Sequence, residues 1–389
     1  MAESRSLKVV SVLLHVHSLV SDSRSSLAFY KNGLAGCKTI ISAVLWLAIL
    51  QVLSGCQPSG SHIEGTPYHH VDGGYRNPPG SPFREGNLDD TLSAYTDRIK
   101  EAITGYAPTL SPEYILDPGE IRKGLAQIKG QDSLTWLGHA SFLIKLGGKT
   151  ILTDPFLSDF ATGMPPFGPV RATPPALVVG ELPLIDILVV SHNHYDHLDA
   201  ETIEALPRKD IIRVIVPLGM GYFFTDRGYK LVTELDWYTS SDVAGIKVTA
   251  VPAIHGSGRG LFDRNAELWA SYVFNIGTKQ IYFSSDTAYG PVYPEIAQKI
   301  GPVDYALVPI GVYEPRKRMK SVHVNPAEAI RIARDLQATT VVAMHWGTIR
   351  LSDEAFEEPP RRYRQVAEEN GFTEKTAWLL KIGESRPLN

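Results

Sequence analysis

The chain has 389 residues, 43% of them hydrophobic and 21% charged, which excludes a disordered chain and allows one large domain or two small ones. Its formal net charge of −4 gives no sign of the basic surface that nucleic-acid binding demands, so we expect no nucleic-acid partner. Both cysteines, Cys37 and Cys56, precede residue 57, so any metal site farther along must use histidine and carboxylate ligands.

Residues 1–55 are predicted to be an export signal. An apolar run from Thr39 to Leu53 follows a basic flank and leads directly to Cys56. The tetrapeptide that ends at Cys56, Leu-Ser-Gly-Cys, resembles the bacterial lipobox, whose cysteine is lipidated and becomes the mature N-terminus. A transmembrane anchor is the alternative, but the run is shorter than the roughly 20 apolar residues that span a bilayer. We therefore expect a lipid anchor at Cys56 and a place in the bacterial cell envelope.

The next segment, residues 56–92, is dense in proline, glycine and serine, which is typical of a tether with little regular structure. His69 and His70 lie within it, and we interpret them as solvated rather than as metal ligands. Residues 93–130 are predicted to be a helical lead-in, because apolar residues recur at helical spacing over residues 88–105.

Residues 131–389 are predicted to form one domain of many strands and a few helices. A helix is expected to begin at Asn325, with Pro326 as its first residue and Glu328 as the reciprocal capping partner. Strands in quantity with interspersed helices favour two packed sheets with helices outside. The short apolar runs that predict strands are Phe142–Leu146, Thr150–Thr153, Ile185–Ser191, Arg213–Pro217, Lys247–Val251, Tyr272–Ile276, Gln280–Ser284, Asp304–Ile310, Thr340–Met344 and Ala377–Lys381.

The strongest chemical signal follows the run that ends at Ser191. His192, His194, Asp196 and His197 stand within six residues. Alternate side chains of an extended loop point the same way, so His192 and His194 converge on one ion. Asp196 and His197 are then placed to serve a second ion. If these four residues had a purely structural role, several polar side chains at one strand end would all have to find hydrogen-bond partners by accident.

Three further apolar strands lead to a candidate ligand: His255, Asp286 and His345. Each residue taken alone is weak evidence for a metal site, because a histidine after a strand is usually a hydrogen-bonded structural residue. Together with the first cluster they supply seven ligands, which matches two zinc ions sharing a bridging carboxylate.

The pattern His-x-His-x-Asp-His, followed by single His, Asp and His residues at strand ends, resembles the metallo-β-lactamase superfamily. Over roughly residues 130–389, further blocks resemble one family within it, the N-acyl-phosphatidylethanolamine-hydrolysing phospholipases D. Those blocks are Thr135–Ala140, Leu152–Pro155, Ser191–Asp199, Pro309–Arg316, His345–Thr348 and Gly383–Arg386.

The resemblance implies an α/β (α+β) hydrolase domain folded as an αββα four-layer sandwich with two Zn²⁺ ions. It assigns site one to His192, His194 and His255, site two to Asp196, His197 and His345, and the bridge to Asp286.

The resemblance also implies roles around the ligands. His139, Asp154 and Tyr195 would orient the ligands rather than coordinate. His323 would contact the substrate phosphate as a catalytic residue, with a surface-loop histidine as the alternative. The sequence departs from the family at Arg316–Lys320, which is basic where aromatic residues are expected, and at Val322, where glutamine is expected. These departures bear on acyl and head-group preference.

The activity implied is hydrolysis of an N-acyl-phosphatidylethanolamine-like phospholipid to phosphatidic acid and an N-acylethanolamine. The expected partners are this substrate and a membrane surface, reached through the lipid anchor, and a second copy of the chain is left open. The basic run Arg316–Lys320 either attracts an anionic lipid surface or is a solvated loop.

Two other functions remain as alternatives. One is a zinc hydrolase of a small phosphorylated or lactone substrate, and the other is a non-enzymic metal-binding envelope lipoprotein. A β-lactamase is disfavoured because its common type uses a cysteine ligand. A redox diiron protein is disfavoured because His194 stands where that group usually carries glutamate.

Overall fold

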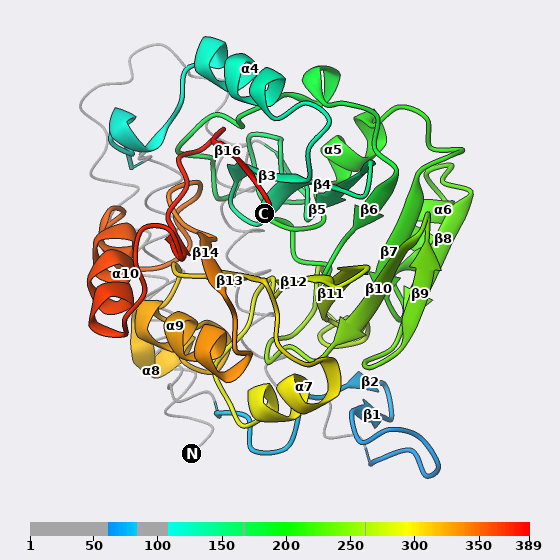
Figure 1. Cartoon of the computed structure of the whole chain (residues 1–389). Helices are drawn as coiled ribbons and strands as arrows, with labels where there is room; N and C mark the ends of the chain where they lie inside the picture. The colour runs from blue at the N-terminus through cyan, green and yellow to red at the C-terminus, as the bar shows by residue number, and fades with distance from the viewer. Residues whose placement is uncertain (1–60, 84–107, 166–167, 261) are drawn as a thin grey trace, which may run out of the picture. The chain divides into compact units, whose positions relative to one another are not determined.

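Two seven-stranded sheets form the centre of the fold (Figure 1). The computed structural model describes residues 61–83, 108–165, 168–260 and 262–389, which belong to one compact unit, Ser54–Asn389. The first sheet has the order β16-β3-β4-β5-β6-β7-β8 and consists of β3 (Ser133–Gly138), β4 (Ser141–Leu146), β5 (Lys149–Thr153), β6 (Ile187–Val189), β7 (Arg213–Pro217), β8 (Leu231–Leu235) and β16 (Ser385–Pro387).

The second sheet has the order β15-β14-β13-β12-β11-β10-β9. It consists of β9 (Ser240–Val243), β10 (Ile246–Val251), β11 (Ser271–Ile276), β12 (Lys279–Phe283), β13 (Tyr305–Pro309), β14 (Thr340–Met344) and β15 (Ala377–Trp378). The strands from β5 to β8 and from β12 to β15 pair in parallel, whereas the remaining neighbours in both sheets are antiparallel. The carboxyl ends of the parallel strands are where each sheet contributes loops to the site.

Both faces of each sheet are covered, which explains the continuous apolar runs. In β4, Phe142 and Ile144 pack in the core cluster shared with the second sheet, while Leu143 packs with Ile203 and Phe224 of the outer helices. Alternate strand residues point to opposite faces, so a strand buried on both sides is apolar throughout. The predicted pair of packed sheets is confirmed.

Helices form the outer layers. The first sheet is covered by α4 (Pro118–Gln127), α5 (Ala200–Ala205) and α6 (Gly221–Thr225), whose apolar residues share a cluster with it. The second sheet is covered by α7 (Val292–Ile300), α9 (Pro326–Asp335) and α10 (Glu358–Glu369). Short helices η2 (Pro112–Tyr114), η3 (Val179–Glu181) and α8 (Arg316–Met319) lie in connections. The result is the αββα sandwich that the resemblance implied.

Every apolar run predicted as a strand coincides with one, although β6, β13 and β15 are shorter than their runs. Of the strands not predicted, β3 is fully buried, but Ser133, Thr135 and Gly138 interrupt its apolar residues. The others are peripheral. β8 and β9 each place only one residue in the core and leave others exposed, so their sequences lack the apolar signal. β16 is three residues long and pairs at the sheet edge with β3.

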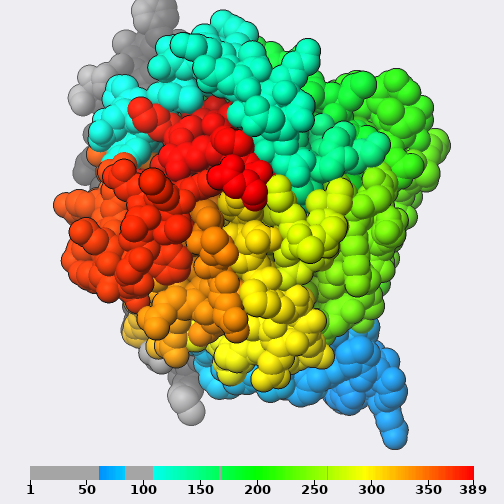
Figure 2. Space-filling model, viewed as in Figure 1, coloured from blue at the N-terminus to red at the C-terminus, as the bar shows by residue number. Residues whose placement is uncertain are grey.

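Residues 61–83 pack against the domain, which their proline- and glycine-rich composition did not indicate. They contain β1 (His70–Val71) and β2 (Gly74–Tyr75), which pair with each other, and the Tyr75 amide donates to the Asn265 carbonyl at 2.8 Å. Figure 2 shows this segment, in blue, against the yellow surface around α7, consistent with the close approach of Gly80 to Pro291. The expectation that His69 is solvated is wrong, because its side chain is buried.

The export signal, Cys56 and the predicted helix over residues 88–105 lie outside the described residues, so those predictions stay as they were. Within the described ranges, no helix combines the length and apolar character needed to cross a membrane.

The helix predicted at Asn325 is α9. The Asn325 side chain accepts a hydrogen bond from the Glu328 amide at 2.9 Å, and the Glu328 carboxylate accepts from the Asn325 amide at 3.0 Å. This capping box satisfies two amide groups that a helix N-terminus leaves without partners.

We expect Asn325→Ala to lower the free energy of unfolding by about 1 kcal/mol, because the Glu328 amide loses its acceptor. Asn325→Asp keeps an acceptor at the same place and is the matched control. Urea unfolding of both variants measures the effect, and an alanine variant as stable as the wild type would contradict the capping assignment.

Candidate metal centre

The loop after β6 carries the four clustered candidate ligands, and one buried carboxylate holds it. Asp154, at the end of β5, accepts hydrogen bonds from the Ser191 amide (2.7 Å), the Ser191 hydroxyl (2.6 Å) and the Ser285 hydroxyl (2.7 Å). Its Oδ2 also lies 2.7 Å from Nδ1 of His197. An N–H donated from Nδ1 leaves Nε2 of His197 free to bind a metal, which is the orienting role predicted for Asp154.

One group of ligand atoms comes from three histidines. Nδ1 of His194 lies 2.9 Å from Nε2 of His192 and 3.2 Å from Nε2 of His255. Nδ1 of His255 donates to the Val322 carbonyl at 2.9 Å, so its Nε2 carries the lone pair. These are the three residues predicted for site one, and their ring nitrogens converge.

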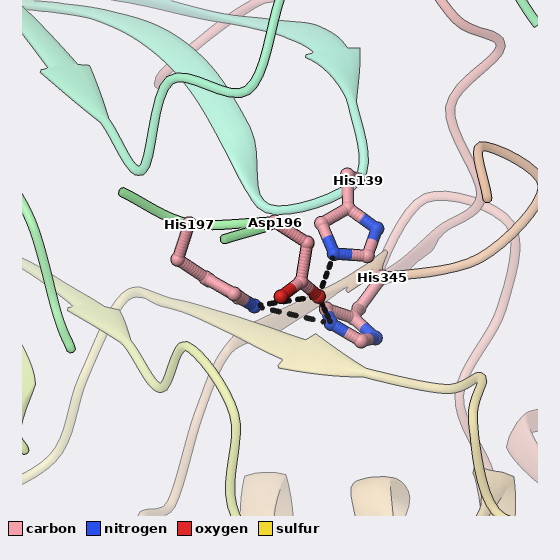
Figure 3. A group of neighbouring side chains, drawn as sticks. All are labelled: His139, Asp196, His197 and His345. Carbon is pink, nitrogen blue, oxygen red and sulfur yellow. Dashed lines mark hydrogen bonds and ion pairs between the residues drawn. The ribbon is translucent and has the colours of Figure 1, made fainter. Parts of the chain in front are cut away.

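A second group comes from Asp196, His197 and His345, with His139 behind them (Figure 3). Nε2 of His345 lies 3.3 Å from Nε2 of His197 and 3.7 Å from Oδ2 of Asp196. His139 contacts that same Oδ2 through its Nε2 at 2.9 Å. His139 thus holds the carboxylate of a predicted site-two ligand, as expected for an orienting residue.

Asp286 lies between the two groups. Its Oδ1 is 2.9 Å from Nε2 of His345, and its Oδ2 is 3.2 Å from Nε2 of His197, 3.6 Å from that of His255 and 4.0 Å from that of His192. Oδ1 is buried and makes no hydrogen bond in spite of the short distance to His345. A buried carboxylate oxygen aimed among ligand nitrogens without hydrogen-bond geometry fits coordination to a cation. The placement is that of the predicted bridge.

Burial and charge act in opposite directions in this cluster. Burial and neighbouring imidazoles lower the pKa of His192 well below its usual range and that of His194 to about 3. Burial also opposes protonation of His345, but the carboxylates of Asp286 and Asp196 outweigh it and raise its pKa to about 9. The two carboxylates need positive charge, which bound metal ions would supply in place of protons.

The backbone at the site adopts conformations that non-glycine residues rarely take. His139, Asp154, Ser285 and His345 all have positive φ angles, of 54°, 33°, 50° and 60°. Each costs roughly 1–3 kcal/mol and persists only where the surrounding structure enforces it. The turns allow His139 and His345 to approach the centre directly from strand ends.

Sequence reasoning missed other residues that hold the ligands. Ser285 pairs with Asp154, and Asn77 pairs with both backbone groups of His255, accepting from its amide at 2.9 Å and donating to its carbonyl at 2.8 Å. No local pattern marks Asn77, which is 178 residues away in the chain. Tyr195, predicted to orient ligands, instead donates to the Arg259 carbonyl at 2.9 Å and so braces a neighbouring loop.

His323 lies beside the centre, so its alternative interpretation as a surface-loop histidine is wrong. Its side chain is buried, and its Nδ1 is 3.9 Å from Oδ2 of Asp286 without a hydrogen-bond partner. The Arg316 guanidinium donates to its backbone carbonyl at 3.0 Å, which fixes the position of the residue.

An αββα sandwich whose loops bring seven histidine and aspartate side chains together at one buried centre defines a metal-dependent hydrolase. The chain belongs to the metallo-β-lactamase superfamily, since residues 149–346 match the family model described as "Beta-lactamase superfamily domain".

Two relatives narrow the resemblance. The chain is 36% identical to the N-acyl-phosphatidylethanolamine-hydrolyzing phospholipase D 1 of Caenorhabditis elegans, over 64% of this chain and 74% of the relative. It is 38% identical to the mitochondrial enzyme of that name from Saccharomyces cerevisiae, over 62% of this chain and 53% of the relative. The chain thus spans about half the length of the yeast protein.

Solved structures share the fold. An isothiocyanate hydrolase from Delia radicum gut bacteria superposes with a TM-score of 0.53 at 20% identity, covering 66% of this chain and 99% of that one. The metallo hydrolase Igni18 from Ignicoccus hospitalis gives a TM-score of 0.50 at 20% identity, covering 67% and 99%.

We expect His345→Ala and His192→Ala each to lower the metal content of the purified protein by one ion, because each removes a ligand from a different group. Among the carboxylates, Asp286→Asn should lose the most metal, since a neutral amide cannot balance two cations. Elemental analysis of the variants measures this. Asp286→Asn with the same metal content as Asp196→Asn or the wild type would contradict a bridging position.

Proposed function

We propose that the protein is a dinuclear zinc phosphodiesterase of phospholipase D type. The supporting observation is the position of Asp286, which faces two separate groups of ligand atoms within one buried centre. Histidine and carboxylate ligands without cysteine suit zinc, and two adjacent divalent ions suit the in-line displacement at a phosphodiester.

The proposed substrate is an N-acyl-phosphatidylethanolamine-like phospholipid, cleaved to phosphatidic acid and an N-acylethanolamine. Two relatives whose names carry this activity, at 36% and 38% identity, support it. A metal-dependent hydrolase from Pelotomaculum thermopropionicum, 28% identical, covers 66% of this chain and 99% of its own. The name of that relative specifies no substrate, so a zinc hydrolase of a small phosphorylated or lactone substrate is kept as the second candidate.

The chain's own residues have distinct tasks in this reaction. When bound, two zinc ions supply positive charge that neutralises phosphoryl oxygens and makes water a nucleophile at neutral pH. Asp286 and the histidines hold that charge in place, and His139 and Asp154 keep Asp196 and His197 oriented. The surrounding side chains are buried, which excludes bulk water and strengthens each electrostatic contact.

His323 is proposed to bind the phosphate. Burial lowers its pKa well below the usual range, so the ring is neutral and one nitrogen carries a proton to donate. Its Nδ1 has no partner and lies next to the proposed bridging carboxylate. A neutral donor fixed there stabilises the charge that develops on a phosphoryl oxygen in the transition state.

The first test of this function is hydrolysis of N-acyl-phosphatidylethanolamine in heavy-oxygen water. Attack at phosphorus puts the label into phosphatidic acid and none into the N-acylethanolamine. His323→Ala should lower kcat by roughly 10²-fold while the metal content is retained, because a single transition-state donor is lost. Mass spectrometry of both products and elemental analysis provide the measurements.

Two outcomes would overturn this proposal. Label in the released alcohol, or diacylglycerol as the lipid product, would mean that a different bond is cut. Turnover of a lactone or sugar phosphate with none of the phospholipid would favour the second candidate.

We also propose that Cys56 is lipidated and holds the enzyme at a membrane of the cell envelope. A lipid with two acyl chains is hardly present as free monomer, so an enzyme held at the surface meets it at a high effective concentration. Cys56→Ser should move the protein from the membrane to the soluble fraction of the expressing bacteria and abolish lipid modification. An unmodified N-terminus upstream of Cys56 in the mature wild-type protein, found by mass spectrometry, would rule the anchor out.

A further inference from the structure

A second cluster of potential ligands lies away from the centre. Nε2 of His69 lies 2.5 Å from Oδ1 of Asp236, and Nε2 of His70 lies 2.8 Å from Oδ2 of the same carboxylate. The histidines are on the β1–β2 hairpin, and Asp236 directly follows β8. The side chains of His69, His70 and Asp236 are 7%, 19% and 17% exposed, so the cluster is mostly enclosed but keeps some access to solvent.

The two imidazoles are aimed at one point. Adjacent residues of an extended chain direct their side chains to opposite faces, yet the His69 and His70 rings lie edge to face with centroids 4.6 Å apart. His69 stacks on Trp237 at 4.1 Å, and His70 meets Tyr75 edge to face at 5.2 Å. Aromatic neighbours therefore hold both rings with Nε2 toward Asp236.

The carboxylate is held in a fixed position by several contacts. Its two oxygens each face Nε2 of one histidine. The Trp237 amide also donates to Oδ1 at 2.7 Å, which orients the group. Two imidazoles and a carboxylate match the protein ligands of three-ligand zinc sites, in which solvent fills the remaining position.

The distances resemble those at the metal centre described above. There, the closest ligand atoms of His192 and His194 and of His345 and Asp286 lie 2.9 Å apart. The ligand atoms of His69, His70 and Asp236 all lie within 4.8 Å of one another. Both sets of ligand atoms are therefore compact enough to surround a single ion.

We propose that His69, His70 and Asp236 bind an additional divalent transition-metal ion, with zinc as the first candidate. The site has three protein ligands and one solvent-facing side, so it binds more weakly than the centre and is filled at higher free zinc. Coordination at Nε2 requires that each imidazole carry its proton on Nδ1. The additional ion joins the hairpin to the connection after β8 and thereby secures the segment that bears Asn77, the partner of His255.

The test is equilibrium dialysis of the full metal-depleted protein against zinc at two buffered free concentrations, one low and one several-fold higher. We expect the wild type to gain one ion between the two concentrations. His70→Ala and Asp236→Asn should gain none while they retain the ions bound at low zinc, which also shows that they are folded. The midpoint of thermal unfolding should rise with the added zinc in the wild type and not in these variants.

Glu64→Ala is the matched control, because it removes an exposed charged side chain of the same segment that is outside the cluster. It should gain the additional ion as the wild type does. A wild type that gains no ion would show that the cluster is held by hydrogen bonds alone. A gain that persists in His70→Ala would assign the ion to another place. Both results are independent of the substrate and of the reaction.

Discussion

Asp154 is fully buried and accepts hydrogen bonds from both sheets of the sandwich. Its donors are Ser191 and His197, in the loop after β6 of the first sheet, and Ser285, in the loop after β12 of the second sheet. A buried carboxylate is tolerated only when its oxygens are satisfied, so the two loops must meet at this point. Asp286, one residue beyond Ser285, is thereby brought against His197. The metal centre depends on this junction because its ligands come from both sheets.

Local sequence patterns predicted the parts of the fold and site in which one segment carries the whole signal. His192, His194, Asp196 and His197 are within six residues, and most strands buried on both faces, such as β13 and β14, are continuous apolar runs. The patterns failed where the contact is made by distant residues, where half of a strand faces water, and in β3, where polar residues interrupt a buried strand. β8 and β9 are examples of half-exposed strands. Asn77 and His69 act through partners more than 160 residues away, which no local spacing marks.

The basic run after Pro315 has a structural role that composition did not indicate. Arg316 makes two hydrogen bonds to the Glu328 carboxylate, at 2.8 and 2.9 Å, and donates to the carbonyl of His323. Glu328 is also the capping partner of Asn325. The Arg316 guanidinium is therefore engaged within the fold, whereas Lys317 and Lys320 of the same run are exposed. Its guanidinium joins Glu328, at the start of α9, to the backbone of His323 beside the metal centre.

The hydrogen bonds between Asn77 and His255 affect where the catalytic part of this protein begins. The match to the superfamily domain begins at residue 149. The proline- and glycine-rich stretch before residue 92 has the composition of a linker that the folded domain does not need. A recombinant chain started at residue 84 would keep every candidate ligand of the centre. It would still lack the Asn77 side chain, which fixes the backbone of the ligand His255. The boundary for expression and crystallisation therefore belongs before the hairpin.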